Sequence, residues 1–520
     1  MAEAARKILW VDDEIELLKS HIVFLEEKGY SVTPVSNGED AISRVNDERF
    51  DVVLLDEMMP GLGGIETLEK IRVIDPGIPV VMITKSEEEE LMDEAIVRSI
   101  DDHLIKPVNP IQIYFACRKI LEAKTIREEQ VRKEYVEELG KLQAERFKPL
   151  DWDQWTKLYS GFVRWELALE RIGDSGFKQI HTDQIKESNI EFARYIVENY
   201  KSWIHGAPRP ALSVDIIPKF VVPHLKSGKR VYFIVIDCMR LDQCLSILPL
   251  LEPYYETKTD YCYSILPSAT PYSRNAIFSG LYPSDLRTQY PDMWQEIGTE
   301  DTSKNKYEKV FLEKQLERLR VRLTNPLKYV KIFSLEEGHS IRKQIASYSQ
   351  LQFVAFVFNF VDILAHGRSE SEILQELAPD EAAFRSIMKA WFTHSSLFDI
   401  LKLMAQQKAV VVLTTDHGSV LGRRAALVLG NRDTSTNLRY KYGNNLGCDE
   451  KQALLIKKPE EYRLPADALN KNYIIAKEDY YFVYPTRFHE YERQYRGSFQ
   501  HGGISMEEMI LPCLTMEPRT

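Results

Sequence analysis

The first 124 residues alternate between short, continuously apolar runs and longer amphipathic stretches. Each apolar run ends in polar residues, and the runs are ILWVDDE (8–14), DVVLLDEMMPG (51–61), PVVMITKS (79–86) and DHLIKPVNP (102–110). Such runs are typical of strands buried on both faces of a parallel sheet. The stretch EIELLKSHIVFLEEKG has helical periodicity and ends at Gly29, where a C-terminal cap is expected. The pattern predicts a doubly wound α/β domain.

A second set of apolar runs lies in the C-terminal part of the chain. These runs are RVYFIVIDCMR (230–240), QFVAFVFNFVDILAHG (352–367) and AVVVLTTDHG (409–418). Each leads into an aspartate: Asp237, Asp362 and Asp416. Because sites in such sheets form at the carboxyl ends of the strands, we expect a second, larger α/β domain whose parallel sheet gathers these carboxylates at one edge.

Between the two sets, residues 125–205 carry charged and aromatic residues at helical spacing and few strand signals. The stretches WDQWTKLYSGFVRWELALERI and IEFARYIVENYKSWI place aromatics at i, i+3, i+4 and i+7. We expect three or four amphipathic helices in a small bundle, with the aromatic stripe in its core or, as the alternative, on a partner surface. No helix-turn-helix pattern with a basic recognition helix is evident, so duplex DNA binding is not expected. HGAPRPALS (205–213) is the predicted linker into the last domain.

Length and composition fit this three-part organisation. A chain of 520 residues is too long for one core, and the patterns place boundaries at 1–124, 125–205 and 206–520. A net charge of -11 argues against a general nucleic-acid binder. The six cysteines form no C-x-x-C pair, which indicates reduced thiols, and no apolar run is long enough to span a bilayer. We therefore expect a cytoplasmic protein.

Polar residues at the strand ends of the first domain predict phosphoryl chemistry. The residues are Asp12, Asp13, Asp56, Thr84 and Lys106. Three converging carboxylates repel one another unless a divalent cation joins them, and oxygen ligands favour Mg²⁺. One carboxylate then attacks phosphorus, while the lysine balances charge and the threonine donates to the new phosphate. The alternative is a plain α/β domain with acidic strand ends.

Residues 6–122 resemble the receiver domain of bacterial response regulators, which has a flavodoxin-like fold. The resemblance implies that Asp56 is the phosphoacceptor, that Asp12 and Asp13 are the acidic pair, and that Thr84 and Lys106 are the switch pair. His103 stands where this family usually has Tyr or Phe, and SID (99–101) where a Gly-Ala pair is usual. The first departure concerns the switch and not the phosphorylation.

Histidines accompany the carboxylates of the last domain, and this mixture favours zinc, with manganese as a substitute. Six ligands divide between two ions: Asp362, His366 and His501 for the first, and Asp237, Asp416 and His417 for the second. Two ions about 4 Å apart suit in-line displacement at phosphorus. Thr270, in the turn PSATPYSRNAIFSGLYP (267–283), is the expected nucleophile and a further metal ligand. The alternatives are a plain DHG loop, a surface histidine and a helix cap at SATP.

Residues 215–517 resemble the alkaline phosphatase superfamily, and most closely its PglZ-type members, through VIDCMR, SATPYSRNAIFSGLYP, VDILAHG, TTDHG and HGGIS. The resemblance implies the same nucleophile and metal ligands. The spacing from Thr270 to GLYP is similar to that in the nucleotide pyrophosphatase/phosphodiesterase branch, which implies a phosphodiesterase acting on nucleotides or on short or cyclic oligonucleotides. Arg274 lies one helical turn beyond Thr270 and is a candidate phosphate contact.

Two further segments are candidates for substrate handling. The loop GNRDTSTNLRYKYGNN (430–445) concentrates Arg432, Arg439 and Lys441 beside tyrosines, which suits a phosphate chain with stacked bases or a solvated basic loop. The charged stretch 301–323 predicts an inserted helix that forms a lid or a solvent-exposed face.

Taken together, we expect an α/β multidomain chain: a flavodoxin-like receiver domain, a small helical bundle and a larger alkaline-phosphatase-like α/β domain. This order of domains resembles response regulators linked to type IX protein secretion. The resemblance implies a sensor histidine kinase as partner and a homodimer when phosphorylated or metal-loaded. The alternative function is a signalling adaptor that binds a sigma factor or a secretion-system component and whose metal site is structural.

Overall fold

The structure is a computed structural model that describes residues 5–75, 77–85, 100–145, 149–294, 305–430, 437–466, 471–486 and 488–519. Its contacts divide the chain into two compact units, Met1–Ala144 and Glu145–Thr520. Among the described residues, no helix combines the length and the apolar character needed to cross a bilayer.

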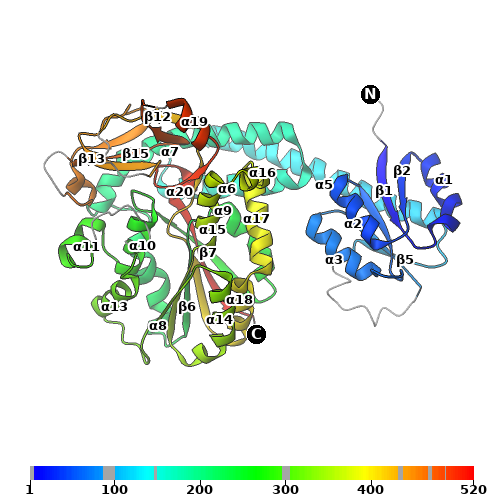
Figure 1. The fold of residues 1–520 in the computed structure, drawn as a ribbon, viewed down its shortest axis with the longest axis horizontal. Helices are drawn as coiled ribbons and strands as arrows, with labels where there is room; N and C mark the ends of the chain where they lie inside the picture. Colours follow the sequence, from blue (N-terminus) through cyan, green and yellow to red (C-terminus); the bar gives the residue numbers. More distant parts are fainter. Residues whose placement is uncertain are drawn as a thin grey trace. The chain divides into compact units, whose positions relative to one another are not determined.

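The first unit is built on a five-stranded parallel sheet in the order β2-β1-β3-β4-β5 (Figure 1). The strands are β1 (Arg6–Val11), β2 (Tyr30–Val35), β3 (Val52–Asp56), β4 (Val80–Thr84) and β5 (Asp102–Ile105). The four predicted strands are present, and β3 and β4 are buried throughout. The pattern missed β2, because this edge strand keeps only Val35 fully buried and so shows no apolar run.

Helices pack on both faces of this sheet, and two glycines shape their ends. The predicted first helix splits into a 3-10 turn (Ile15–Leu18) and α1 (Lys19–Glu27), with Gly29 at φ +89° just beyond it. The other described helices are α2 (Gly38–Asp47), α3 (Gly64–Ile74) and α5 (Pro110–Glu145). Gly64 begins α3 at a close approach, because a Cβ there would lie 2.2 Å from the Asp56 carbonyl oxygen.

The second unit is centred on a six-stranded sheet in the order β7-β18-β10-β6-β9-β8. Four strands are parallel: β10 (Val410–Thr414), β6 (Val231–Ile236), β9 (Phe353–Phe358) and β8 (Lys328–Ile332). The prediction of a parallel sheet needs correction, because β18 (Ile510–Pro518) and β7 (Tyr255–Tyr263) add two antiparallel strands at one side. The three predicted runs form the adjacent strands β10, β6 and β9, so their carboxyl ends lie together.

Alternate residues of these strands enter two apolar layers, one on each face of the sheet. One layer includes Ile234 and Phe356 and is covered by α9 (Leu241–Leu251), α14 (Leu335–Gln344), α15 (Phe360–Glu370), α17 (Glu381–His394) and α18 (Ser396–Gln406). The other includes Phe233 and Val357 and is covered by α8 (Val222–Lys226), α10 (Thr270–Ser279), α11 (Pro283–Gln289) and α13 (Glu308–Arg318). Figure 1 shows the two helix groups on opposite sides of β6.

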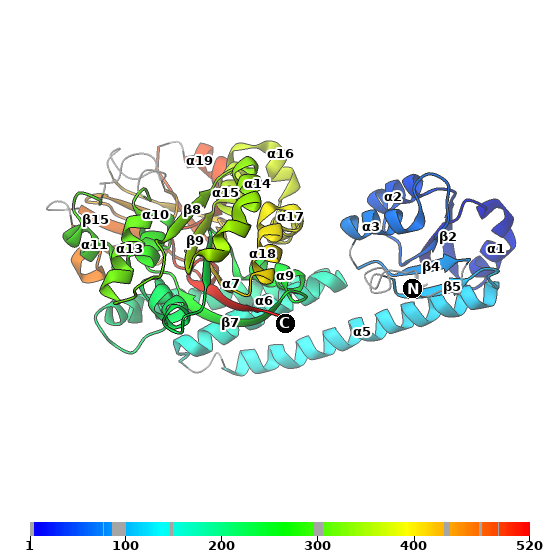
Figure 2. The ribbon, with the colours of Figure 1, turned by 90° about the horizontal axis from the view of Figure 1, so that it is seen from below.

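The helices α6 (Trp152–Ile172) and α7 (Ser175–Ile204) form a hairpin within this unit and run beside β7 (Figure 2). Their aromatic stripe is core: Trp155 packs on Phe192, and both Phe192 and Trp203 contact the ring of Tyr263 on β7. Part of the stripe thus packs against the α/β domain itself.

Smaller β-elements complete the second unit. They are β11 (Val420–Leu421) with β17 (Phe499–Gln500), β12 (Arg424–Leu427) with β16 (Tyr480–Val483), and the three-stranded sheet β13 (Tyr440–Asn444), β15 (Lys471–Ala476) and β14 (Ala453–Ile456). Within the predicted insertion 301–323, residues 305–323 are described, and α13 packs Phe311, Leu312 and Leu316 into the core. The helix therefore buries one face in the core, while Glu317 and Arg318 lie on its exposed face.

Candidate functional sites

The acidic cluster of the first unit lies at the carboxyl ends of β1 and β3. Asp12, Asp13 and Asp56 each place a carboxylate oxygen within 4.8 Å of the others. Lys106 extends from beyond β5, and its Nζ lies 2.9 Å from Asp12 Oδ2 and 2.9 Å from Asp56 Oδ2. Thr84 ends β4 and is buried. The predicted set is thus brought to one sheet edge.

The electrostatics at this edge favour a bound cation. Burial raises the pKa of the Asp56 carboxyl, with a further contribution from Asp12, while Lys106 opposes the rise. A divalent cation held by the three carboxylates would relieve this repulsion. His103, the departure from the usual aromatic, lies exposed on β5 opposite Met82 of β4.

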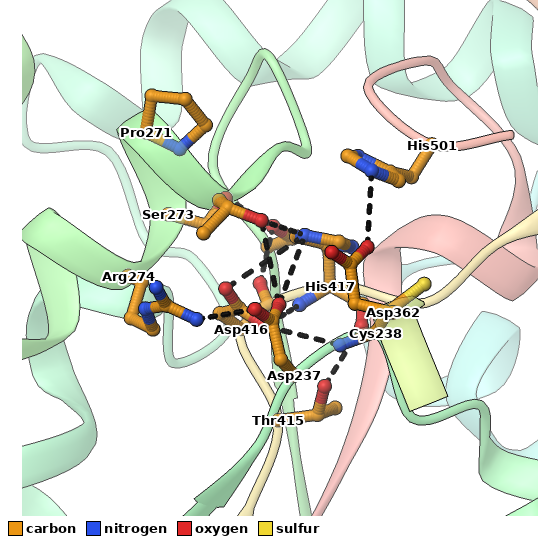
Figure 3. A network of polar contacts seen from close by, with 12 residues as sticks. Asp237, Cys238, Pro271, Ser273, Arg274, Asp362, Thr415, Asp416, His417 and His501 are labelled. Atoms are coloured by element: carbon orange, nitrogen blue, oxygen red, sulfur yellow. Dashed lines mark hydrogen bonds and ion pairs between the residues drawn. The ribbon is translucent and has the colours of Figure 1, made fainter. Parts of the chain in front are cut away.

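In the second unit, the ligands predicted for two ions come from four chain segments. Asp237 follows β6, and Asp416 and His417 follow β10. Asp362 lies in the first turn of α15, with His366 one turn further, and His501 follows β17. Most of these ligands therefore lie just after the end of a strand or in the first turn of a helix. Figure 3 shows His501 and Arg274 approaching the central carboxylates from opposite sides.

The first group consists of Asp362, His366 and His501. The Nε2 atoms of His366 and His501 lie 3.1 Å apart. Asp362 Oδ1 lies 3.3 Å from His366 Nε2 and 3.4 Å from His501 Nε2. Atoms that bind one tetrahedral zinc ion at about 2.0–2.1 Å lie about 3.3 Å from one another. The three ligand atoms have this spacing.

The second group consists of Asp237, Asp416 and His417, and Thr270 joins it. His417 Nε2 lies 3.6 Å from Asp237 Oδ1 and 3.7 Å from Asp416 Oδ2. Thr270 Oγ1 lies 2.9 Å from His417 Nε2 and 3.3 Å from Asp237 Oδ1. Ala269, and not Thr270, is the N-cap of α10, so the threonine side chain is not used as a helix cap.

Hydrogen bonding around these groups leaves ligand atoms without partners. Among the described residues, none donates a hydrogen bond to the buried oxygens Asp362 Oδ1 and Asp416 Oδ2, although the two imidazole nitrogens lie close to Asp362 Oδ1. His417 Nδ1 lies 3.1 Å from the carbonyl oxygen of Gly418, which fixes Nδ1 as the protonated nitrogen and leaves the Nε2 lone pair for the site. Buried carboxylate oxygens without partners are costly, and cations would satisfy them. The donor set and its spacing therefore fit a divalent metal ion in each of the two groups.

The protonation of the second group also depends on a cation. Burial raises the pKa of Asp416 well above its usual value, and the nearby charge of Asp237 adds to the rise. Burial likewise raises the pKa of Asp237, although Arg274 opposes it. The pKa of His417 is well below its usual value because of burial and of the neighbouring His501, so this imidazole is neutral, as a metal ligand must be.

Asp237 is supported from behind by Arg274 and by two residues that the sequence pattern did not reveal, Asn359 and Glu308. Arg274 donates through NH1 to Asp237 Oδ2 and through Nε to Glu308 Oε1 at 2.6 Å. Asn359 Nδ2 donates to Asp237 Oδ2 at 3.0 Å. The candidate phosphate contact Arg274 thus has its Nε and Nη1 held between two carboxylates, and the prediction that it contacts the substrate phosphate stays a prediction. The burial of Glu308 could not be predicted from the sequence, because a glutamate in a charged helix usually faces solvent.

Of the remaining candidate substrate contacts, the structure describes Arg439 and Lys441. Arg439 is fully buried and pairs with Glu508, and it also donates to the carbonyl oxygens of Lys477, Glu478 and Tyr480. Its prediction as a substrate contact is wrong, because these bonds occupy its donors. Lys441 is buried on β13, where burial lowers its pKa to about 8. Arg432 lies outside the described residues.

With this geometry established, comparison with known families identifies the last domain. Residues 216–516 match the family model of the BREX system PglZ alkaline phosphatase-like domain, which covers more than half of the chain. The chain belongs to the PglZ alkaline phosphatase-like family. Ahead of the PglZ domain, residues 8–118 match the response regulator receiver domain and residues 125–204 match the PorX response regulator linker domain. This is the domain order of a PorX-type fusion, and the expected fold classes of its receiver and PglZ domains are confirmed.

Individual relatives share a shorter stretch with this PglZ protein. The transcriptional regulatory protein ResD of Bacillus subtilis is 33% identical over 115 residues, which are 22% of this chain and 48% of the relative. The CpxR homolog of Haemophilus influenzae is 39% identical over 115 residues, or 22% and 50% of the two chains. The chain thus spans about half the length of these relatives. Among solved structures, a CheY-like receiver domain protein from Methanospirillum hungatei is 28% identical, with a TM-score of 0.22 over 23% of this chain and 96% of that one.

Proposed function

We propose that this PglZ protein is a response regulator whose C-terminal domain is a zinc-dependent phosphodiesterase with Thr270 as its nucleophile. The observation that carries the proposal is the position of Thr270 Oγ1, 2.9 Å from His417 Nε2 and 3.3 Å from Asp237 Oδ1, beside a second group of ligands. A threonine that only began a helix would not need two groups of metal-type ligands around it.

In this proposal each ligand group holds one zinc ion. Asp362, His366 and His501 hold the first, and Asp237, Asp416 and His417 hold the second together with Thr270. When bound, the two ions would neutralise the phosphate oxygens and lower the pKa of the attacking hydroxyl and water. His417 and Asp237 hold Thr270 Oγ1 at the N-terminal end of α10. Because Thr270 is buried, direct attack of water on the diester is limited.

The reaction is a double displacement. The Thr270 Oγ1–phosphorus bond forms as the bond from phosphorus to one ester oxygen breaks, and the hydroxyl proton ends on the departing alcohol. A water oxygen then attacks phosphorus, the Oγ1–phosphorus bond breaks, and Thr270 recovers a proton. The sum is a phosphodiester and water converted to a phosphomonoester and an alcohol.

The ion pairs of Arg274 with Asp237 and Glu308 support a diester substrate. A monoester presents an extra anionic oxygen, which an arginine commonly neutralises. Here the Arg274 guanidinium is already held by Asp237 and Glu308. We propose nucleotides or short or cyclic oligonucleotides as substrates, and this assignment rests on the spacing from Thr270 to the turn at Gly280, where φ is +64°.

The receiver domain implies a sensor histidine kinase as partner, and we propose that phosphorylation of Asp56 with Mg²⁺ controls the hydrolase. Asp12 and Asp13 would hold the magnesium ion with Asp56, while Lys106 and Thr84 would respond to the phosphoryl group. The domain order, with a PorX-type linker, also supports a role in type IX protein secretion.

The test compares Thr270→Ala with wild-type full-length protein on bis-p-nitrophenyl phosphate, both loaded with zinc. We expect two zinc ions per chain in the wild type and a loss of about 10³-fold or more in kcat for the variant, because the nucleophile is gone. The control is Thr288→Ala, an exposed threonine of α11 whose hydroxyl bonds only Ser284 of its own helix.

Turnover by Thr270→Ala equal to that of the wild type would refute the assignment of Thr270 as the nucleophile. Absence of turnover in the wild type with diesters of several kinds, together with phosphorylation-dependent capture of a sigma factor or secretion component, would instead favour a signalling adaptor with a structural metal site.

A further inference from the structure

Glu308 occupies a fully buried position at the start of α13 and is not one of the predicted metal ligands. Four donors converge on its carboxylate. Arg274 Nε lies 2.6 Å from Oε1, Asn305 Nδ2 lies 2.9 Å from Oε1, Lys331 Nζ lies 2.6 Å from Oε2, and the Tyr329 hydroxyl also donates to Oε2. A buried carboxylate held by so many donors is fixed in both position and charge.

The charge of Glu308 is maintained despite its burial. Burial raises the pKa of this carboxyl, but Arg274 and Lys331 outweigh the effect, and the net pKa lies below the usual value. Glu308 is therefore an anion at neutral pH. It faces the Arg274 cation, which in turn contacts the Asp237 carboxyl, so one guanidinium joins α13 to the end of β6.

Arg274 connects this buried anion to two functional residues. It lies on α10 one turn beyond Thr270, so its backbone belongs to the helix that carries the proposed nucleophile. Its side chain reaches Asp237 Oδ2, and Figure 3 shows the guanidinium directed at that carboxylate. Asn305, which precedes α13, also donates to the Thr270 carbonyl oxygen at 3.3 Å.

The two oxygens of Asp237 thereby receive different environments. Oδ2 accepts from Arg274 and from Asn359. Oδ1 faces Thr270 Oγ1 at 3.3 Å and His417 Nε2 at 3.6 Å. With Oδ2 occupied, only Oδ1 is presented to the proposed second ion, so the rotamer of Asp237 is set from behind the site.

We propose that Glu308 and Arg274 are positioning residues that fix Asp237 and Thr270 relative to each other for phosphoryl transfer. The proposal rests on the proposed function and goes further by assigning roles to a buried glutamate of the segment 301–323 and to an arginine that holds no phosphate. Neither residue contacts the reacting atoms; both act through Asp237 and α10.

The test uses Glu308→Gln in the full chain, which keeps the shape of the side chain and removes its charge. Because Arg274 loses its anchor, we expect kcat on bis-p-nitrophenyl phosphate to fall about tenfold or more while KM changes less than about twofold. Zinc competition with a chelator, which needs no turnover, should show one of the two zinc sites weakened about tenfold or more and the other unchanged. The matched control is Glu317→Gln, on the exposed side of the same helix, with wild-type values expected in both assays.

A second variant separates positioning from a folding defect. Arg274→Lys removes the fork that joins the two carboxylates but keeps the charge. If Glu308 acts through Arg274, the double variant loses little more kcat than either single variant, whereas independent effects multiply. Two tight zinc sites and wild-type kcat in Glu308→Gln, or multiplicative losses in the double variant, would overturn the proposal. If the wild type itself turns over no diester, the proposed function fails, while the zinc competition still decides whether these residues position Asp237.

Discussion

The attachment of α6 to the PglZ domain leads to a stability prediction centred on Arg385. This residue of α17 is buried and donates to Glu170 Oε2 at 2.6 Å and to Glu166 Oε1 at 3.2 Å, both on α6. It also donates to Asp242 of α9, which pairs with Arg240 at 2.8 Å. The substitution Arg385→Met puts a shorter, unbranched apolar side chain in place of the arginine and removes its bonds to Glu166, Glu170 and Asp242.

The loss in the free energy of unfolding depends on which carboxylates lose their cationic partner. Breaking a buried ion pair by removing one partner costs about 3–5 kcal/mol. Asp242 keeps Arg240, and the side chains of Glu166 and Glu170 are 24% and 29% exposed, so the lower end of that range applies. With an unfolding entropy of about 2.1 cal/mol/K per residue, a unit the size of 145–520 loses about 1.3 °C of Tm per kcal/mol. We therefore expect Arg385→Met to lower Tm by about 4 °C.

The loss also depends on pH. Burial raises the pKa of Glu166 to about 7, and Arg385 is the first group that opposes the rise. Without Arg385, the pKa of Glu166 in the native state rises further. Between the pKa of the unfolded chain and this raised native pKa, the native state holds a proton that the unfolded state has released. The free energy of unfolding therefore falls as the pH rises through this interval. The deficit of the variant should thus be larger at pH 8.5 than at pH 6.

Differential scanning calorimetry of the full chain, followed through the transition of the 145–520 unit, measures this prediction. The control is Arg423→Met, which removes a pair between Arg423 (40% exposed) and Glu381 at 3.1 Å and should shift Tm by less than about 1 °C. A Tm for Arg385→Met within 1 °C of wild type at both pH values would refute the view that the packing of α6 on the PglZ domain stabilises the 145–520 unit.

Two further predictions concern the receiver site and the loop after His417. Acetyl phosphate with Mg²⁺ should label the wild type and the exposed control Asp47→Ala but not Asp56→Ala, and equal labelling of all three would contradict the receiver assignment. Gly418→Ala places a methyl group 2.0 Å from the Glu507 carbonyl oxygen, so the His417 loop must move, and kcat/KM on a diester should fall about tenfold or more. Gly161→Ala, on α6, brings its added methyl within 4 Å of no atom beyond the neighbouring backbone of its own helix, so this control should keep wild-type kcat/KM. Wild-type activity in Gly418→Ala would show that the position of the His417 loop is not critical.

The central strands and the ligand groups could be predicted from the sequence because both depend on local pattern. Strands β6, β9 and β10 are buried on both faces and so appear as unbroken apolar runs. Because their carboxyl ends share one edge, the run-ending residues Asp237, Asp362 and Asp416 could be grouped by sequence pattern alone.

Elements whose environment depends on distant parts of the chain escaped the pattern. Strand β7 alternates exposed and half-buried residues along most of its length, and β8 shows a mixed pattern of buried and exposed residues. Glu308 and Arg439 illustrate the same limit for single residues. In its local sequence each looks like a charge exposed to solvent. In the structure each is buried and forms an ion pair with a residue distant in the sequence, Glu308 with Arg274 and Arg439 with Glu508.

The central claim, attack by Thr270 on a phosphodiester followed by attack of water, is tested most directly by the stereochemistry at phosphorus. A phosphorothioate diester of known configuration would be hydrolysed by the zinc-loaded full chain in ¹⁸O-labelled water, and the configuration of the thiophosphate monoester determined. Two in-line displacements predict net retention of configuration. Net inversion would mean that water attacks the diester in a single step and would contradict the role of Thr270 as nucleophile.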